Sequence, residues 1–536
     1  MNSPKKLSDY FSDYDFEKIK TVPKNSIFRL IFSRTCISLA LIVLQFLFLA
    51  AVTFSWSEQH TEAILLIMIV LSACIFIVIL NSERNPSYKI AWIIPVALLP
   101  VFGSLLFLLF HFNLGSIAST QNVRQTLKET EKYTRTDPQI RASLAGVSRH
   151  TALLSRYIET AGGYATYRNT SVRYFPLGDD AFPDIIQYLE KAKNFIFLEF
   201  FIIQEGVFWN TILEILKRKV KEGVEVRVMY DDIGCMTKLP RNYTSYLTAL
   251  GIKARVFARV TPFFSSHYNN RDHRKILVID GKAAFSGGIN LADEYINREQ
   301  RFGKWKDNCF LVEGSAVKNY TLMFLQMWNT SVPPETRIYE PYLNVPADRR
   351  PQDGDGFVIP YGDGPHQPIS VAQSVYLHII RSAVDHVHIM TPYLILDDEM
   401  LNALKRASKS GVDVRLLLPF IPDKKLINLI GKSYYPELLE AGVRIYEYTP
   451  GFIHSKVVEA DGIIAAVGTI NLDFRSLYLH YECASLIFAN DVLKDITADF
   501  ESTFADSHRI TLSDYKKKPL LFRFAGRVLR VFAPLV

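Results

Sequence analysis

Apolar residues are concentrated near the N-terminus, in three stretches that contain no Asp, Glu, Lys or Arg. These stretches are residues 35–56, 63–80 and 90–110. A helix that crosses a membrane needs about 20 apolar residues, so the first and third are long enough and the second is just adequate. We expect two to three transmembrane helices within residues 31–114, preceded by an N-terminal tail of residues 1–30.

The third stretch and the surrounding charges leave the membrane topology open. Pro95, Pro100 and Gly103 would kink the third stretch or make it re-entrant. Lys and Arg residues precede the first stretch and are absent from residues 57–62, which places the N-terminus in the cytoplasm. Basic residues also follow the third stretch, so the sequence does not fix which side of the membrane holds the remainder.

From about residue 146, short apolar runs alternate with amphipathic stretches. Residues 194–203 and 224–230 are predicted strands on either side of a helix over residues 209–221, and this order recurs in the second half. Alternating strands and helices predict a mixed or largely parallel sheet covered by helices. The expected parts are a linker of residues 115–145, a first domain of residues 146–335, a Pro-rich linker of residues 336–356, a second domain of residues 357–510 and a basic amphipathic C-terminal helix of residues 511–536.

The second half of the chain repeats the first. HRKILVIDG begins at His273 and HSKVVEADG begins at His454, 181 residues later. Between His273 and Leu291, nine of 19 positions are identical in the second copy. Farther upstream, KEGVEVRVMYD corresponds to KSGVDVRLLLP. Two copies of one α/β unit are therefore expected side by side.

Each copy places one imidazole and one ammonium group on the same face of a strand. His273 and Lys275 lie two residues apart, as do His454 and Lys456, and side chains alternate along a strand with a period of two. If the halves pack about a pseudo-twofold axis, both pairs meet in one cleft. A lone His-x-Lys-x4-Asp pattern would be weak, whereas two equivalent copies indicate function.

Two imidazoles and two lysines suit chemistry at a phosphate diester. One neutral imidazole can attack phosphorus and form a covalent phosphohistidine, while the other, protonated, donates its proton to the leaving alkoxide. The lysines would face the non-bridging oxygens, where negative charge accumulates. Asn290 and Asn471, a few residues after each motif, are expected to add hydrogen bonds to the phosphate.

Composition narrows the partners only slightly. The formal net charge of +7 fits anionic partners such as lipid head groups or nucleic acid. The five cysteines are scattered without a CxxC pair, which argues against a disulfide framework or a zinc ribbon. His386 and His388 share a strand face, but the sequence shows no third ligand near them, so neither a metal nor another cofactor is expected.

The doubled HxKxxxxDG motif, each copy followed by Gly-x-x-Asn, resembles the hallmark of the phospholipase D superfamily. RDHRKILVIDGKAAFSGGINLADEY and HSKVVEADGIIAAVGTINLDFRSL are similar to the two signatures of bacterial cardiolipin synthases, and ERNPSYKIAWIIPVALLPVFGSLLFLLF resembles their N-terminal segment. The resemblance runs from about residue 83 to the C-terminus. It implies two tandem phospholipase D-like α/β sandwich domains related by pseudo-twofold symmetry and preceded by transmembrane helices.

The resemblance also implies roles for individual residues. His273 becomes the nucleophile and His454 the acid/base, although the exchanged assignment fits the sequence equally well. In the superfamily each histidine is usually steadied by a carboxylate on a later strand. Asp307 matches that place in the first half and Glu482 in the second.

Other motif positions are less directly tied to chemistry. Asp280 and Asp461 belong to the catalytic motif, but in the family they look more structural than chemical. The chain departs from the family at His480, where Asn is usual, and at Gly288, where Ser or Thr is common. His480 could alter the acceptor pocket. An additional apolar stretch precedes the family's usual pair.

The implied protein is a multi-pass cardiolipin synthase of the bacterial cell membrane. It would cleave one phosphatidylglycerol to a phosphatidyl-enzyme and glycerol, and a second phosphatidylglycerol would then attack to give cardiolipin. A phospholipase D that releases phosphatidic acid, or a transferase with another alcohol acceptor, remains the alternative. A nuclease would not need the apolar stretches, so no nucleic-acid partner is expected, and a non-catalytic scaffold would have lost part of the doubled motif. The oligomeric state stays open.

The C-terminal sequence PLLFRFAGRVLRVFAPLV predicts an amphipathic helix. Arg523, Arg527 and Arg530 fall on one face and apolar residues largely on the other. We expect this helix to lie on an anionic membrane; the other interpretation is a terminal helix docked on the domain.

Overall fold

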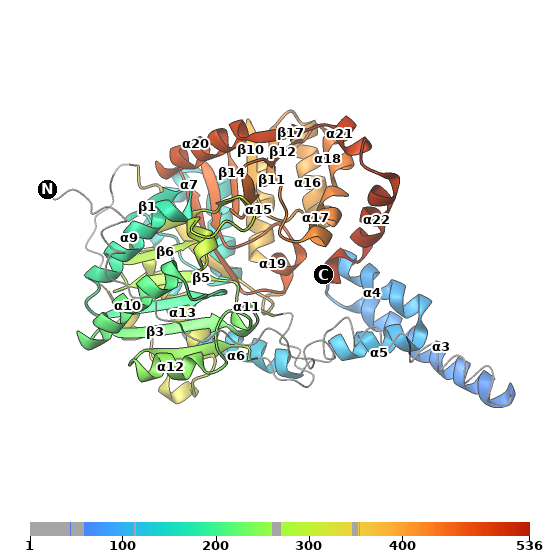
Figure 1. Cartoon of the computed structure of the whole chain (residues 1–536), viewed down its shortest axis with the longest axis horizontal. Helices are drawn as coiled ribbons and strands as arrows, with labels where there is room; N and C mark the ends of the chain where they lie inside the picture. Colours follow the sequence, from blue (N-terminus) through green and yellow to red (C-terminus); the bar gives the residue numbers. More distant parts are fainter. Residues whose placement is uncertain are drawn as a thin grey trace.

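The structure, a computed structural model of the 536-residue chain, describes residues 58–111, 114–259, 270–345 and 354–535, together with residues 43 and 352. Apart from Val43, the N-terminal tail and the first apolar stretch lie outside the described residues. Helices precede the first sheet, and one of them extends away from the main body of the protein (Figure 1). These helices are α3 (Glu58–Asn81), α4 (Pro86–Leu98), α5 (Pro100–His111), α6 (Leu114–Thr130), α7 (Pro138–Val147) and α8 (Arg149–Tyr157).

The third apolar stretch is not one continuous helix. It forms α4 and α5, which pack on each other, because the backbone leaves helical geometry at Leu99 and Pro100 begins the second helix. Gly103 permits the close approach, since a Cβ there would lie 2.2 Å from the Pro95 carbonyl oxygen. Of the forms left open for this stretch, the structure shows the kinked one, with the break at Leu99 and Pro100. Within the described residues, no helix is both long and apolar enough to cross a membrane.

The first half forms a seven-stranded mixed sheet with the strand order β1-β8-β6-β5-β2-β3-β4. Strands β2, β3 and β4 pair in parallel, and the remaining pairs are antiparallel. The strands are β1 (Thr170–Phe175), β2 (Phe195–Phe200), β3 (Glu225–Asp231), β4 (Lys253–Phe257), β5 (Lys275–Ile279), β6 (Ala283–Gly287) and β8 (Cys309–Gly314).

The second half repeats this sheet. Its order is β17-β12-β11-β10-β14-β15-β16-β9, so from β9 to β12 it has the topology of the first sheet, with β17 added at the edge. This confirms two copies of one α/β unit and makes each sheet mixed rather than largely parallel. The strands are β9 (Phe357–Asp363), β10 (His386–Met390), β11 (Asp413–Pro419), β12 (Arg444–Tyr448), β14 (Val457–Ala460), β15 (Ile464–Gly468), β16 (Glu482–Phe488) and β17 (Ser507–Ile510).

Helices cover both faces of each sheet (Figure 1). Helices of the first half are α9 (Gly178–Lys191), α10 (Val207–Lys221), α11 (Asp232–Cys235), α12 (Tyr243–Ala249), α13 (Val317–Asn329) and α14 (Glu340–Leu343). Those of the second half are α15 (Val371–Ser382), α16 (Asp398–Lys409), α17 (Lys425–Lys432), α18 (Tyr435–Ala441), α19 (Phe474–Tyr478) and α20 (Val492–Ala505), followed by α21 (Leu512–Lys516) and α22 (Leu520–Val531).

Two equivalent helices join the halves. Helix α13 covers the first sheet and also packs on β9 of the second, while α20 covers the second sheet and packs on β1 of the first. Every residue of α13 except Lys318 is buried. Since each buried large apolar side chain contributes about 1.5–3 kcal/mol, this shared core holds the halves in a fixed relation.

A two-stranded parallel sheet of β7 (Lys304–Lys306) and β13 (Gly451–Ile453) also bridges the halves. Gly451 is needed at this contact, because a Cβ there would lie 2.2 Å from the Lys304 carbonyl oxygen. The bridge matters for the site, because β13 ends at the residue before His454.

The aspartates of the repeated motif hold the strand turns. Asp280 has a φ of +53° and Asp461 a φ of +56°. The Asp280 carboxylate accepts backbone N–H bonds from residues 193–195 at 2.7–2.9 Å, and that of Asp461 accepts bonds of 2.8 Å from residues 384–386. Each aspartate thus ties the end of one strand to the start of its neighbour, at the opposite strand end from the motif histidine.

Candidate active site

Backbone pairing between the halves brings the two motif histidines into one place. The His273 N–H donates to the Tyr481 carbonyl at 2.9 Å, beside a parallel bridge between Asp272 and Tyr481. In the same way, the His454 N–H donates to the Lys306 carbonyl at 2.7 Å, where β13 meets β7. Each histidine is therefore aligned with the residue that precedes a carboxylate of the other half.

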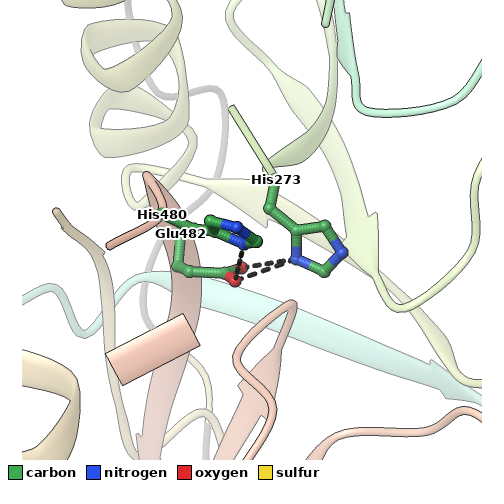
Figure 2. Close-up of side chains that lie close together, drawn as sticks. All are labelled: His273, His480 and Glu482. Atoms are coloured by element: carbon green, nitrogen blue, oxygen red, sulfur yellow. Dashed lines mark hydrogen bonds and ion pairs between the residues drawn. The ribbon is translucent and has the colours of Figure 1, made fainter. Parts of the chain in front are cut away.

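The two carboxylates contact the histidines crosswise. Nδ1 of His273 lies 2.9 Å from both carboxylate oxygens of Glu482, and Nδ1 of His454 lies 2.6 Å from Oδ2 of Asp307 (Figure 2 shows the first pair). The sequence matched Asp307 and Glu482 to their own halves. The structure assigns each carboxylate to the histidine of the other half. Each histidine pairs through its backbone with Tyr481 or Lys306, and the residue that follows, Glu482 or Asp307, then lies against its imidazole.

Both motif lysines are buried beside the histidines. Lys275 Nζ donates to the His273 carbonyl at 2.7 Å, and Lys456 Nζ donates to the His454 carbonyl. Burial lowers the pKa of Lys275 to about 8 and that of Lys456 to about 7, and Lys275 adds to the lowering at Lys456. The four side chains thus lie within electrostatic reach of one another and form one site.

The same burial favours neutral imidazoles. It holds the pKa of His273 well below its ordinary value and lowers the pKa of His454 to about 4, with the neighbouring lysines adding to both shifts. With the carboxyl group at Nδ1, the second ring nitrogen of His273 points away from Glu482 (Figure 2). A neutral ring in this orientation keeps a lone pair at Nε2, as a nucleophile requires.

The carboxylates are supported differently in the two halves. Thr469 Oγ1 donates to Glu482, and its backbone N–H donates to the Cys483 carbonyl at 2.9 Å. The equivalent position in the first half is Gly288, where a Cβ would come within 1.8 Å of Oδ1 of Asp307. The glycine that departs from the family pattern therefore leaves space for the carboxylate that contacts His454.

The two predicted asparagines are buried close to the site and hydrogen-bond to neighbouring protein groups, although Oδ1 of Asn471 has no partner among the described residues. Oδ1 of Asn290 accepts from the Ile202 N–H at 3.0 Å, and its Nδ2 donates to the Tyr295 hydroxyl at 2.8 Å. Asn471 Nδ2 donates to Ser476 at 3.0 Å. These contacts give the asparagines a positioning role, and direct phosphate binding by them stays a prediction.

His480 is a site neighbour whose position the sequence did not reveal. Its ring centroid lies 5.6 Å from that of His273, and its Nδ1 lies 3.8 Å from the Glu482 carboxylate (Figure 2). The side chain is buried, yet neither ring nitrogen has a hydrogen-bond partner among the described residues. Its departure from the family pattern was the signal for its importance; its orientation toward the site depends on the cross-half pairing.

Two buried arginines flank His273 in the sequence and pair with groups near the site. Arg271 makes an ion pair of 2.8 Å with Asp231, and the guanidinium of Arg274 donates to the Glu482 carbonyl at 3.3 Å. Burial raises the pKa of Asp272, which lies between the two arginines in sequence, to about 6. Arg271, Asp272 and Arg274 lie within the first signature, but the sequence assigned them no role, because buried charge pairs leave no periodic signal.

Two groups of side chains have the geometry to share a metal ion among the described residues. One is His273, His480 and Glu482 in the active site. The other is His386, His388 and Glu459 on the second sheet. The active-site group also supports metal-free phosphoryl chemistry, because its histidine is already oriented by the carboxylate.

Comparisons with known proteins identify the fold and the family. Residues 185–328 and 376–504 match the family model described as "Cardiolipin synthase, PLD-like domain", and residues 68–110 match "Phospholipase D-nuclease N-terminal". An uncharacterized protein of Streptococcus mutans is 46% identical over 85% of this chain and 98% of its own. A cardiolipin synthase of Geobacillus kaustophilus is 35% identical over 87% of this chain and 93% of its own.

A more distant solved structure shares the fold. The crystal structure of a phosphatidylserine synthase from Haemophilus influenzae superposes with a TM-score of 0.51 at 13% identity, covering 72% of this chain and 98% of that one. The likeness spans both halves, as expected for a duplicated α/β architecture.

The lowered lysine pKa values predict a pH-dependent affinity for anions. Sulfate keeps its charge across the neutral range, so its binding reports the state of the protein. Below pH 7 both lysines are protonated; as the pH rises through about 7, Lys456 loses its proton, followed by Lys275 near pH 8. We expect sulfate affinity, measured by calorimetry, to fall up to about tenfold per pH unit above pH 7.

Lys456→Met provides the matched control for this titration. It should bind sulfate weakly and lose the step near pH 7, while the step near pH 8 remains. A wild-type affinity that is constant from pH 6 to pH 9 would contradict the electrostatic description of the site.

Proposed function

Because this chain belongs to the family of cardiolipin synthases with PLD-like domains, we propose that it makes cardiolipin by transferring a phosphatidyl group between two molecules of phosphatidylglycerol. The observation that carries the proposal is a single buried site with two histidines, each held by a carboxylate of the other half, and two lysines. Relatives named cardiolipin synthase cover most of the chain, which supports the substrate class.

We assign the first displacement to His273. Its Nε2 attacks phosphorus of one phosphatidylglycerol, the bond from phosphorus to the head-group glycerol oxygen breaks, and a phosphatidyl–histidine bond forms. His454, protonated in the substrate complex, transfers its proton to the departing glycerol oxygen. The negative phosphate supplies the charge that raises the pKa of His454 above its value of about 4 in the free site.

The second displacement reverses the first with a new alcohol. The head-group hydroxyl of a second phosphatidylglycerol gives its proton to His454 and attacks phosphorus, and the bond from phosphorus to His273 breaks. Cardiolipin leaves, and both histidines return to their initial states. Lys275 and Lys456 face the non-bridging oxygens in both steps and stabilise the charge that builds up there.

The remaining motif residues act by holding this geometry. Asp307 and Glu482 fix the orientation of the imidazoles, and Asn290 and Asn471 hold the adjoining loops. Asp280 and Asp461 tie neighbouring strands together within their halves. We place these halves in domains of residues 146–335 and 357–510. His480, with two unsatisfied ring nitrogens beside His273, is suited to hydrogen-bond the head-group hydroxyl of the acceptor.

We also propose that the N-terminal segment anchors the enzyme in the membrane as a multi-pass protein. Helix α3 projects from the body of the protein (Figure 1) and exposes apolar side chains. These include Leu66, Ile67, Ile69, Val70, Ile77 and Val78. An exposed apolar surface of this kind is typical of contact with lipid rather than water.

The C-terminal helix α22 provides a second lipid-facing surface. Arg530 faces inward, with an ion pair of 2.7 Å to Glu437, and the helix packs on α17. Leu520, Leu521 and Phe524 are each more than two-thirds exposed. The helix is therefore docked on the domain by one face and presents its apolar face outward, which combines the two interpretations of its sequence.

The active site is connected to the N-terminal helices. Asn85, between α3 and α4, donates to the Asp397 carboxylate at 3.0 Å and to the Tyr478 hydroxyl at 2.8 Å. Tyr478 lies two residues before His480 and four before Glu482. Lipid held against the N-terminal helices is thus brought close to the loop that carries the acceptor side of the site.

The proposed reaction predicts one lipid product. Full-length protein in detergent micelles, supplied with labelled phosphatidylglycerol, should release glycerol and form cardiolipin, measured by chromatographic separation of lipid classes. His273→Ala should abolish turnover, and His454→Ala should lower it by about 10²–10⁴-fold because the general acid is lost. His480→Ala should shift products toward phosphatidic acid. Phosphatidic acid as the sole wild-type product, or full activity of either catalytic variant, would overturn the proposal.

Membrane anchoring makes a separate prediction. After expression, the full chain should stay in the membrane fraction through an alkaline carbonate wash and be released only by detergent, as judged by immunoblotting. Recovery of the full chain in the carbonate supernatant would contradict anchoring by the N-terminal helices without affecting the proposed chemistry.

A further inference from the structure

A second cluster of ligating side chains lies on the second sheet, away from the paired histidines of the active site. Nε2 of His386 lies 3.2 Å from the carboxylate of Glu459, and Nδ1 of His388 lies 3.5 Å from Oε2 of the same group. The three ligand atoms all lie within 4.8 Å of one another. The sequence offered the two histidines without a third ligand; the antiparallel pairing of β10 with β14 supplies Glu459 directly opposite His388.

The first half shows that the fold does not need polar groups at these positions. In the equivalent strands, Phe197 stands opposite Val278, as His388 stands opposite Glu459. Phe197 stacks on Phe324 of α13, an ordinary core contact with ring centroids 4.6 Å apart. The second copy has thus placed a carboxylate and an imidazole where its duplicate has two apolar side chains.

These polar groups are buried without full satisfaction. His388 is 3% exposed and Glu459 is fully buried. Among the described residues, neither ring nitrogen of His388 has a hydrogen-bond partner, and neither does Oε2 of Glu459. The other oxygen, Oε1, accepts from the Gly462 N–H at 2.6 Å and also lies 3.2 Å from Nε2 of His386. Oε2 faces both histidines, 3.2 Å from Nε2 of His386 and 3.5 Å from Nδ1 of His388. Unpartnered buried polar atoms are costly unless a ligand completes them.

The arginines nearest the cluster pair with carboxylates other than Glu459. Asp413, the cross-strand neighbour of His386, pairs with Arg415 at 2.7 Å and with Arg444 at 2.9 Å. Arg415, the cross-strand neighbour of His388, also reaches Glu501 at 3.3 Å. Arg415 is therefore engaged by two carboxylates other than Glu459. On the remaining side, the rings of Phe500 and Phe504 of α20 contact His388 and offer no charge.

We propose that His386, His388 and Glu459 bind a divalent transition-metal ion of the zinc type. Two imidazole nitrogens and one carboxylate oxygen are a donor set that suits zinc and is poorly suited to calcium or magnesium. Zinc bonds of about 2.0–2.1 Å in tetrahedral geometry place neighbouring ligand atoms roughly 3.3–3.4 Å apart. The separations of 3.2 and 3.5 Å from Glu459 to the histidines match this edge length.

The ion would act as a structural clamp. It joins β10 to β14 beneath α20, and α20 reaches the first half through Asp499. That carboxylate pairs with Lys306 at 2.5 Å and accepts from the Tyr174 hydroxyl at 2.8 Å. Lys306 directly precedes Asp307, so the clamp stabilises the side of the interface that supports His454. The inference is independent of the acceptor used in the proposed reaction.

The test uses the full chain in detergent, stripped with EDTA and then exposed to micromolar Zn²⁺ or Co²⁺. We expect one zinc per chain by elemental mass spectrometry after buffer exchange, visible absorption bands of tetrahedral Co²⁺, and a zinc-dependent rise in Tm of roughly 3 °C or more. The double substitution His388→Phe with Glu459→Val recreates the apolar pair of the first half. It should fold and bind zinc about 100-fold more weakly or worse.

Three further variants separate this site from others. Glu459→Gln keeps the side-chain volume and should also weaken zinc binding, and the exposed His508→Ala should leave it unchanged. His480→Ala disrupts the ligand set of the active site and should retain the bound zinc. Three results would each overturn the proposal: a wild-type protein that does not bind zinc, a double variant that still binds it, or a His480→Ala variant that loses it. If the wild type does not bind zinc, the cluster is instead an ion pair between a protonated His386 and Glu459.

Discussion

The contact between each motif histidine and a carboxylate of the other half is the interaction on which the rest of the structure depends. Nδ1 of His273 contacts Glu482 and Nδ1 of His454 contacts Asp307. In both cases the residue before the carboxylate accepts a hydrogen bond from the backbone N–H of the histidine. Neither half can orient its own histidine. The duplicated fold, the shared packing of α13 and α20 and the bridge between β7 and β13 all serve to keep these two contacts in register.

Burial explains both the cost and the use of this arrangement. Placing two lysines and two histidines together out of water lowers the pKa of all four side chains, so the free site favours neutral imidazoles and weakly held lysine protons. In the proposed reaction a phosphodiester reverses this situation, because its negative charge raises the pKa of the lysines and of the histidine proposed as general acid, so that these groups hold their protons. The positions of the four side chains are thus set before the anion arrives, and binding of the anion completes their charge.

Much of this organisation was predictable from the sequence, and the exceptions have clear physical reasons. The repeat from His273 to Leu291 required a duplicated fold, and the strand period of two placed each histidine with its lysine. The crosswise carboxylates were not predictable, because pairing between halves depends on how two sheets pack. Glu459 appeared as one acidic residue within an apolar strand, and only the register of β14 against β10 makes it a partner of His388. The break between α4 and α5 was signalled by Pro100, although composition alone suggested one continuous helix.

The central claim is that the two motifs form one site and carry out one displacement at a time. The most direct test is to quench the enzyme in base during turnover of phosphatidylglycerol and to locate the phosphatidyl–histidine bond by mass spectrometry of the digested chain. The account predicts an adduct on the peptide that contains His273, never exceeding one per chain. Adducts on both histidines that approach two per chain would contradict it, because each motif would then be a site of its own.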